Sequence, residues 1–257
     1  MLVLALTWAG CAAGCGGSSA GALTGTPYTP GSATVIGKGG DEYDTPTAGC
    51  RDTFCDAALD RCSATGAADV IVDANGKVVD VICYKQDVSV VQVPVDQVPS
   101  YTTPGNNSVL VIDGADDGVD VAGDVTVSGN NAVIYGSGPD TSVIGGTVQV
   151  EKNNAQIRGV RIVGDVTIDK NDTKLVLCVI EGNLTITGNN TTVAECDVFG
   201  TVTITGNNTV LVDDRFNGAS TLSGINLVCS ADIRFDDANG DHVADASELG
   251  GPVTCDG

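Results

Sequence analysis

The sequence predicts an all-β protein whose central part is a solenoid of stacked coils, each about 18 residues long. Four segments carry the repeat, GTVQVEKNN, GDVTIDKND, GNLTITGNN and GTVTITGNN, and they begin at Gly146, Gly164, Gly182 and Gly200. Within each segment apolar and polar residues alternate, which indicates a β-strand. A fixed period of this length is typical of proteins in which each unit buries its apolar residues against its neighbours.

The apolar residues also keep the same position in successive units. One column contains Val148, Val166, Leu184 and Val202, and another contains Ile157, Leu175, Val193 and Leu211. Antiparallel neighbours would not repeat the same residue type at the same phase, because they run in opposite directions. We therefore expect parallel strands, about three per coil, each lying on its counterpart one coil away at roughly 4.8 Å.

Asn pairs, or an Asn–Asp pair, mark a turn in each unit. They begin at Asn106, Asn130, Asn153, Asn171, Asn189 and Asn207. Asn tolerates the left-handed conformation of tight turns, and its amide can bond to the Asn of the next coil. The pattern resembles the right-handed parallel β-helix superfamily, the fold of pectate lyases and many bacterial surface proteins. The resemblance covers about residues 105–235 and implies the fold, without a particular function.

The first two intervals between Asn pairs, 24 and 23 residues, exceed the 18-residue period. The added residues should leave the coil as loops around GADDGVDVA and YGSGPDTS, where binding sites on rigid scaffolds often lie. The first loop contains four acidic residues, Asp113, Asp116, Asp117 and Asp120. They form either a metal site or a solvated acidic turn.

The first residues, MLVLALTWAGCAAGCGGSSAG, have the layout of an export signal. Within them WAGC and AAGC resemble a bacterial lipobox, at which the chain is cut before an acylated Cys. We expect a signal peptide over residues 1–15 with lipidation at Cys15, Cys11 being the alternative, and a flexible tether over residues 16–49. The protein would then be exported and anchored by lipid to the bacterial outer membrane or cell surface.

Lipidation of Cys15 leaves an even number of cysteines, which suits disulfides in an oxidising compartment. These disulfide candidates are Cys50, Cys55, Cys62, Cys83, Cys178, Cys196, Cys229 and Cys255. The first four belong to a hairpin module over residues 50–98, and their pairing stays open. Cys178 and Cys196, one period apart, are either a staple between coils or two reduced core thiols. A Cys229–Cys255 bond would close a C-terminal cap, residues 236–257, over the end of the solenoid, residues 99–235.

The segment DANGDHVADASE, residues 237–248, resembles a calcium loop of the EF-hand or dockerin kind. Its oxygen donors would be Asp237, Asn239, Asp241, Val243 through its carbonyl, Asp245 and Glu248. It departs from the pattern where His242 replaces the usual Gly and where Ala244 replaces a β-branched residue. The alternative is an Asp/Asn-rich surface turn. We expect Ca²⁺ with a structural role.

Charge and motifs favour a protein without catalytic activity. The net charge of −21 repels nucleic acid, the single His lies in the calcium loop, and no nucleophile motif is present. A lyase would need a basic residue beside carboxylates. In the repeats only Lys152 and Lys170, next to Glu151 and Asp169, qualify, and we expect these four to form an exposed charge ladder.

We therefore expect a structural or adhesive protein, with a polysaccharide or another surface protein as partner. The alternative is a polysaccharide-binding or lyase-type polysaccharide-degrading protein. A groove in which Lys or Arg faces carboxylates would favour the enzyme, whereas a smooth Thr/Asn/Asp face would favour the structural role. A small array of the ice-binding kind, Thr185, Thr187, Thr203 and Thr205, spans two units only and fits ordinary strand propensity.

Overall fold

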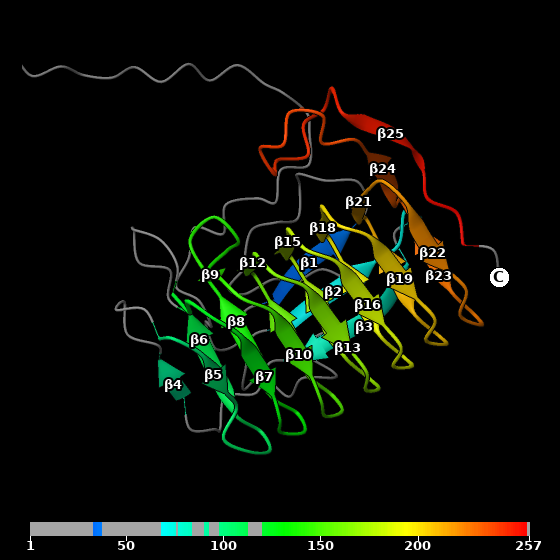
Figure 1. Cartoon of the computed structure of the whole chain (residues 1–257). Helices are drawn as coiled ribbons and strands as arrows, with labels where there is room; N and C mark the ends of the chain where they lie inside the picture. Colours follow the sequence, from blue (N-terminus) through cyan, green and yellow to red (C-terminus); the bar gives the residue numbers. More distant parts are fainter. Residues whose placement is uncertain are drawn as a thin grey trace, which may run out of the picture.

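The computed structural model describes residues 33–37, 68–75, 77–83, 90–92, 98–112 and 120–255. Over these residues the protein is all-β, without a helix. Most of its strands form a parallel solenoid with three sheets, and a smaller sheet lies beside it (Figure 1). The predicted signal peptide with Cys11 and Cys15, most of the tether, Cys50, Cys55, Cys62 and three of the loop aspartates, Asp113, Asp116 and Asp117, lie outside the described residues.

Each complete coil contributes one strand to each of three sheets. Sheet D contains β5 (Tyr101–Thr102), β7 (Val125–Val127), β10 (Val148–Val150), β13 (Val166–Ile168), β16 (Leu184–Ile186), β19 (Val202–Ile204) and β22 (Ser220–Leu222). Sheet B contains β4 (Val90–Gln92), β6 (Val109–Ile112), β8 (Val133–Gly136), β11 (Gln156–Arg158), β14 (Lys174–Val176), β17 (Thr192–Ala194), β20 (Val210–Val212) and β23 (Val228–Ser230).

Sheet C contains β9 (Val143–Ile144), β12 (Arg161–Ile162), β15 (Val179–Ile180), β18 (Asp197–Val198), β21 (Arg215–Asn217), β24 (Ile233–Phe235) and β25 (Leu249–Pro252). All neighbours in sheets D, B and C are parallel except the last pair, because β25 runs antiparallel to β24. The small sheet, sheet A, joins β1 (Ala33–Gly37), β2 (Ala68–Val72) and β3 (Val78–Cys83).

The strand register confirms the columns predicted from the period. Val166 pairs with Val148 on one side and with Leu184 on the other, and Leu184 pairs with Val202. These residues point inward together with the predicted Ile and Leu columns, and the resulting core is almost wholly inaccessible to solvent. The parallel β-solenoid that the sequence predicts is therefore the architecture of the chain.

The Asn pairs form the turn between sheets D and B, as predicted. The second residue of each pair has a left-handed backbone, with φ of 54° to 60° from Asn107 to Asn208. Where this residue is Asn, its amide donates to the same position one coil earlier, as Asn208 Nδ2 does to Asn190 Oδ1 at 3.0 Å, and Asp172 takes part as an acceptor only. The first residue of each pair instead accepts a backbone N–H, as Asn189 Oδ1 does from Asn207 at 2.9 Å. The two ladders satisfy turn groups that the strands cannot pair.

Glycine is needed at the turn that leads into sheet D, because successive coils touch there through their backbones. A Cβ at Gly200 would lie 2.4 Å from the carbonyl oxygen of Gly182, and one at Gly164 would lie 2.7 Å from that of Gly146. Any side chain at these positions would push neighbouring coils apart. The repeated Gly of the sequence is therefore a spacing requirement.

Two strands lie in segments for which the sequence predicted a different role. β1 lies inside the segment predicted to be a tether, where the β-branched run Thr34–Ile36 pairs in parallel with β2. The solenoid also begins before residue 99, because β4 pairs with β6 inside the range assigned to the hairpin module. The prolines there do not end the solenoid, since Pro99 and Pro104 lie outside the strands, where no ladder N–H is required.

We predict that the left-handed turn of the Asn ladder contributes measurably to stability. Asn190→Ala should lower the free energy of unfolding by about 1–3 kcal/mol, because it removes two ladder hydrogen bonds and the side-chain amide through which Asn tolerates the left-handed conformation. Asn190→Gly should cost about 1 kcal/mol less, since only the hydrogen bonds are lost. Urea denaturation measures both, with exposed Thr205→Ala as the control. Equal losses of stability for Ala and Gly would show that the left-handed backbone at residue 190 does not contribute to the difference.

Candidate functional site

The outer face of sheet B is covered by sheet A. Ile71 and Ile82 of the hairpin pack on Val133, Tyr135 and other residues that point outward from sheet B. The hairpin itself agrees with the prediction, since β2 and β3 are antiparallel. Cys83 at its end is disulfide-bonded to a cysteine outside the described residues. This face of the solenoid is therefore a packing interface.

Two ion pairs fix sheet A on sheet B. The guanidinium of Arg158 bonds to both carboxylate oxygens of Asp69, at 2.7 and 3.2 Å, and both residues are buried. Lys174 Nζ lies 2.6 Å from Asp80 Oδ2, which also accepts from the Thr192 hydroxyl. Burial raises the pKa of Asp80, but the Lys174 charge and these hydrogen bonds outweigh it, so the pKa is lowered. Arg158 and Lys174 are therefore structural residues of the interface between sheets A and B.

The predicted calcium loop covers part of the outer face of sheet C. Ala244 packs against Val179, Phe199 and Phe235, and the His242 ring lies edge-on to Phe199. Arg215 forms a two-point ion pair with Asp197 and donates through Nη1 to the Ala244 carbonyl at 3.0 Å. The loop was predicted to close over the end of the solenoid. It lies on a side because Phe199 and Phe235 offer an apolar surface there.

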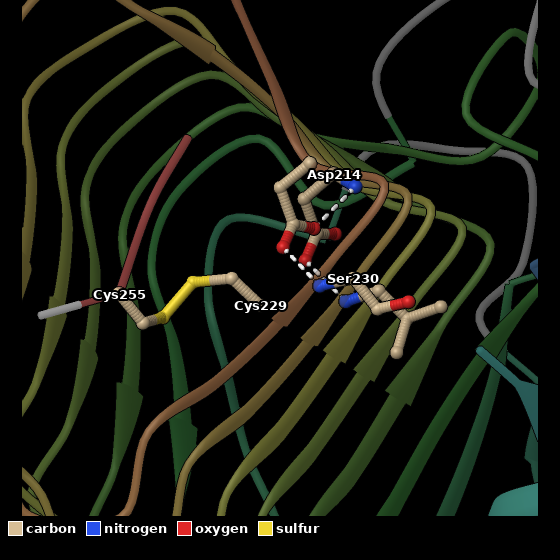
Figure 2. Close-up of a disulfide and its surroundings, with 6 residues drawn as sticks. Asp214, Cys229, Ser230 and Cys255 are labelled. Atoms are coloured by element: carbon tan, nitrogen blue, oxygen red, sulfur yellow. Dashed lines mark hydrogen bonds between the residues drawn. A yellow bond between two sulfur atoms is a disulfide. The ribbon is translucent and has the colours of Figure 1, made fainter. Parts of the chain in front are cut away.

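The segment after the loop closes the C-terminal end, and here the predicted disulfide is present. Cys229 of β23 is bonded to Cys255, which follows β25 (Figure 2). Val253 reaches the apolar core, and its N–H donates to the Asp232 carbonyl at 2.9 Å. Strand β25 pairs antiparallel with β24, so sheet C cannot continue with another parallel coil.

Cys178 and Cys196 are both free and buried, which decides between the two alternatives of the sequence in favour of reduced thiols in the core. Each lies in the turn between sheets B and C, one coil apart. Among the described cysteines, only Cys229 and Cys255 are bonded to each other.

The calcium loop has the backbone path but not the gathered ligands of an ion site. His242, at the sixth place, has a φ of 57°, the left-handed conformation for which glycine is usual. Asp237 Oδ1 accepts from the Gly240 N–H, and Asp241 Oδ1 accepts from the Val243 N–H. Within the described part of the chain, no three His, Cys, Asp or Glu groups lie together as a metal site. The carboxylates of Asp237 and Asp241 are thus used in hydrogen bonds within the loop.

The structure also places three other residues that the sequence singled out, Asp120, Lys152 and Lys170. Asp120 is buried and accepts the Val143 N–H at 2.8 Å, a structural role. Lys152 and Lys170 are exposed and form no ion pair with any described residue, so the predicted charge ladder is absent. Asp169 is held instead by neutral groups, the amide of Gln149 and the hydroxyl of Thr187.

Sheet D is the face that stays accessible (Figure 1). Its outward, mid-strand positions form one column across all seven strands, namely Thr102, Thr126, Gln149, Thr167, Thr185, Thr203 and Thr221. Two further columns of exposed or half-exposed polar residues flank it. From Gln149 to Thr221 this column follows the 18-residue period, whereas the two longer coils shift Thr102 and Thr126 out of it.

The open face of sheet D has two halves that differ in charge. The acidic half, on β7, β10 and β13, is flanked by Asp124, Glu151, Asp165 and Asp169. A hydrogen bond from the Thr147 backbone N–H lowers the pKa of Asp124, which favours its charged form. The hydroxyl half, on β16 and β19, carries no charge and consists of Asn183, Thr185, Thr187, Thr201, Thr203 and Thr205.

No protein-family model, curated protein or solved structure matches the chain. The described residues include no helix long and apolar enough to span a membrane. Function therefore has to be inferred from the three faces, the cap and the charge distribution.

Proposed function

We propose that this chain is an exported, non-enzymatic surface protein with a structural or adhesive role, and that the outer face of sheet D is its contact surface. One observation carries the proposal. Of the three solenoid faces, sheet B is packed under sheet A and sheet C is partly covered by the C-terminal loop, while sheet D exposes an ordered array of hydroxyl, amide and carboxylate groups.

Two arginines of sheet C support a role without catalysis, whereas Lys152 and Lys170, which form no ion pair with a described residue, are basic groups left to the lyase-type alternative. Arg161 is bonded to the Pro139 carbonyl and to Glu181, and Arg215 to Asp197 and the Ala244 carbonyl. A lyase base has to be free to take a proton from the substrate. The open face presents mainly Thr, Asn, Asp and Gln side chains, which suit the contact surface of this proposal.

Export and anchoring belong to the same proposal. The lipobox-like sequence at Cys15, or at Cys11, would place the chain on the outer membrane or cell surface, and the Cys229–Cys255 disulfide suits an oxidising compartment. The partner would be a polysaccharide or another surface protein, because the net charge of −21 disfavours nucleic acid.

We predict that the sheet D face binds cell-wall or environmental polysaccharides without cleaving them. Thr185→Lys with Thr203→Lys should reduce retention in a glycan pull-down at least tenfold, because two long side chains would stand on the hydroxyl half. Val163→Lys, an exposed position at the edge of sheet C, is the matched control. Release of unsaturated sugars by the unaltered protein would contradict the non-enzymatic role. Equal binding by all variants would contradict the proposal that the outer face of sheet D is the contact surface.

Calcium would stabilise the C-terminal loop in this proposal, through Asp237, Asn239, Asp241, the Val243 carbonyl, Asp245 and Glu248. Calcium at a hundredfold excess over its dissociation constant should raise the melting temperature by about 5–10 °C. Asp241→Asn combined with Glu248→Gln should abolish the shift, whereas Asp236→Asn, an exposed residue just outside the loop, should retain it. Calorimetry with and without a chelator measures this, and an unchanged melting temperature would contradict calcium binding.

A further inference from the structure

Two buried aspartates lie one above the other at the C-terminal end of the solenoid. Asp214 is 0 % exposed and Asp232 is 2 % exposed. They occupy the same position in the turn between sheets B and C, one coil apart, where the preceding coils have the Cys178 and Cys196 thiols. The residue before each aspartate has a left-handed backbone, with φ of 56° at Asp213 and 64° at Ala231.

Each carboxyl group accepts one backbone N–H from its own turn and one from the neighbouring coil. Asp214 accepts the N–H of Val212 at 3.2 Å and that of Cys196, one coil earlier, at 2.8 Å. Asp232 accepts the N–H of Ser230 and that of Asp214, both at 2.9 Å. The last two coils are thus joined through the carboxyl groups as well as through their strands (Figure 2).

Asp232 also contacts the segment that closes the C-terminal end, residues 249–255. Ser230 follows Cys229 in β23, so the strand that donates to Asp232 also carries the disulfide to Cys255 (Figure 2). The Asp232 carbonyl accepts the Val253 N–H. Loosening the turn at Asp232 would therefore release the last coil and the segment that closes it.

No cation of the described chain balances the two carboxyl groups. Neither aspartate forms an ion pair with a described residue, Arg215 is bonded to Asp197, and Arg234 is exposed. The other titratable groups in the adjoining turns are Cys196, Glu195 and Asp213, with Asp73 in the hairpin turn whose Ala74 N–H donates to Ser230. The one basic group of that hairpin turn, Lys77, is exposed and forms no ion pair with a described residue. Two carboxylates here would therefore repel each other in a water-free site.

We propose that Asp214 and Asp232 make closure of the C-terminal coil dependent on acid. A bound proton keeps the last coil and the segment that covers it closed, and ionisation of both carboxyl groups loosens this coil and its covering segment.

The pKa shifts agree in direction with this geometry. Burial, together with the charge of Asp232, raises the pKa of Asp214 well above its ordinary value. Burial raises the pKa of Asp232 to about 7, although its backbone N–H partners act in the opposite direction. An opened end would ionise near the ordinary value of 3.8. Opening therefore releases a proton between about pH 4 and pH 7. The stabilisation of the closed coil by this proton is complete below pH 4 and is lost as the pH rises through 7.

Hydrogen exchange of the full-length, disulfide-bonded protein between pH 5 and 7 tests the proposal. After correction for the intrinsic exchange rate, opening of residues 210–235 and 249–255 should increase about tenfold per pH unit for each proton released. The internal coils over residues 125–170, which make no hydrogen bond to either aspartate, should not respond. A flat profile at the C-terminal end, or the same slope in the internal coils, would overturn the proposal.

Asp232→Asn tests whether the proton itself is responsible, because an amide keeps one acceptor oxygen for the turn but cannot ionise. The pH dependence should fall to that of the single proton of Asp214 in this variant, disappear when Asp214→Asn is added, and persist in full in Asp236→Asn, an exposed aspartate four residues away. Because the new amide group would meet the Ser230 N–H, the variant can weaken the turn by itself. A carboxyl-carbon NMR titration of the unaltered protein is therefore the second measurement. Titration of Asp232 near pH 7 supports the proposal, and titration of both aspartates near pH 4 overturns it.

Discussion

The structure depends on one constraint, the parallel hydrogen bonding that places each residue directly on its counterpart one coil away. Backbone N–H groups of one coil donate to carbonyls of the next at about 2.9 Å along strands and turns alike. A side chain in the repeats therefore always meets the residue 18 positions before or after it. Columns of one residue type follow from this, with aliphatic residues inside, Asn where the backbone is left-handed and Gly where coils touch.

The same constraint leaves ends and faces that the chain has to cover. A parallel stack exposes unpaired strand edges at each end, and such edges invite further pairing. At the C-terminal end β25, Val253 and the Cys229–Cys255 disulfide close part of the stack. Apolar outward residues of sheets B and C are covered by sheet A and the C-terminal loop. The threonine columns of sheet D need no cover, because they are polar.

The sequence was sufficient to predict what repeats. The columns, the Asn turn and the coil length follow from a period that any reader can count, and the terminal disulfide follows from two cysteines that flank the last segment. The docking of sheet A was missed because its contacts do not repeat. Arg158 and Asp69 are separated by 89 residues, and Lys174 and Asp80 by 94. The one available signal was a charged residue, Arg158 or Lys174, in columns that are otherwise mainly apolar or neutral.

Deletion of one whole coil tests most directly whether register alone determines the fold. Removal of residues 164–181 joins two positions of equal phase. It keeps Asp197, Phe199 and the Cys229–Cys255 bond, and it removes two residues that contact the C-terminal loop, Val179 and Glu181. The shortened chain should fold cooperatively with the Cys229–Cys255 bond formed, losing roughly the stability of one coil and of the Lys174–Asp80 pair. Deletion of residues 164–172, half a period, should prevent folding. Circular dichroism with denaturant titration decides, and equal behaviour of the two deletions would contradict the account.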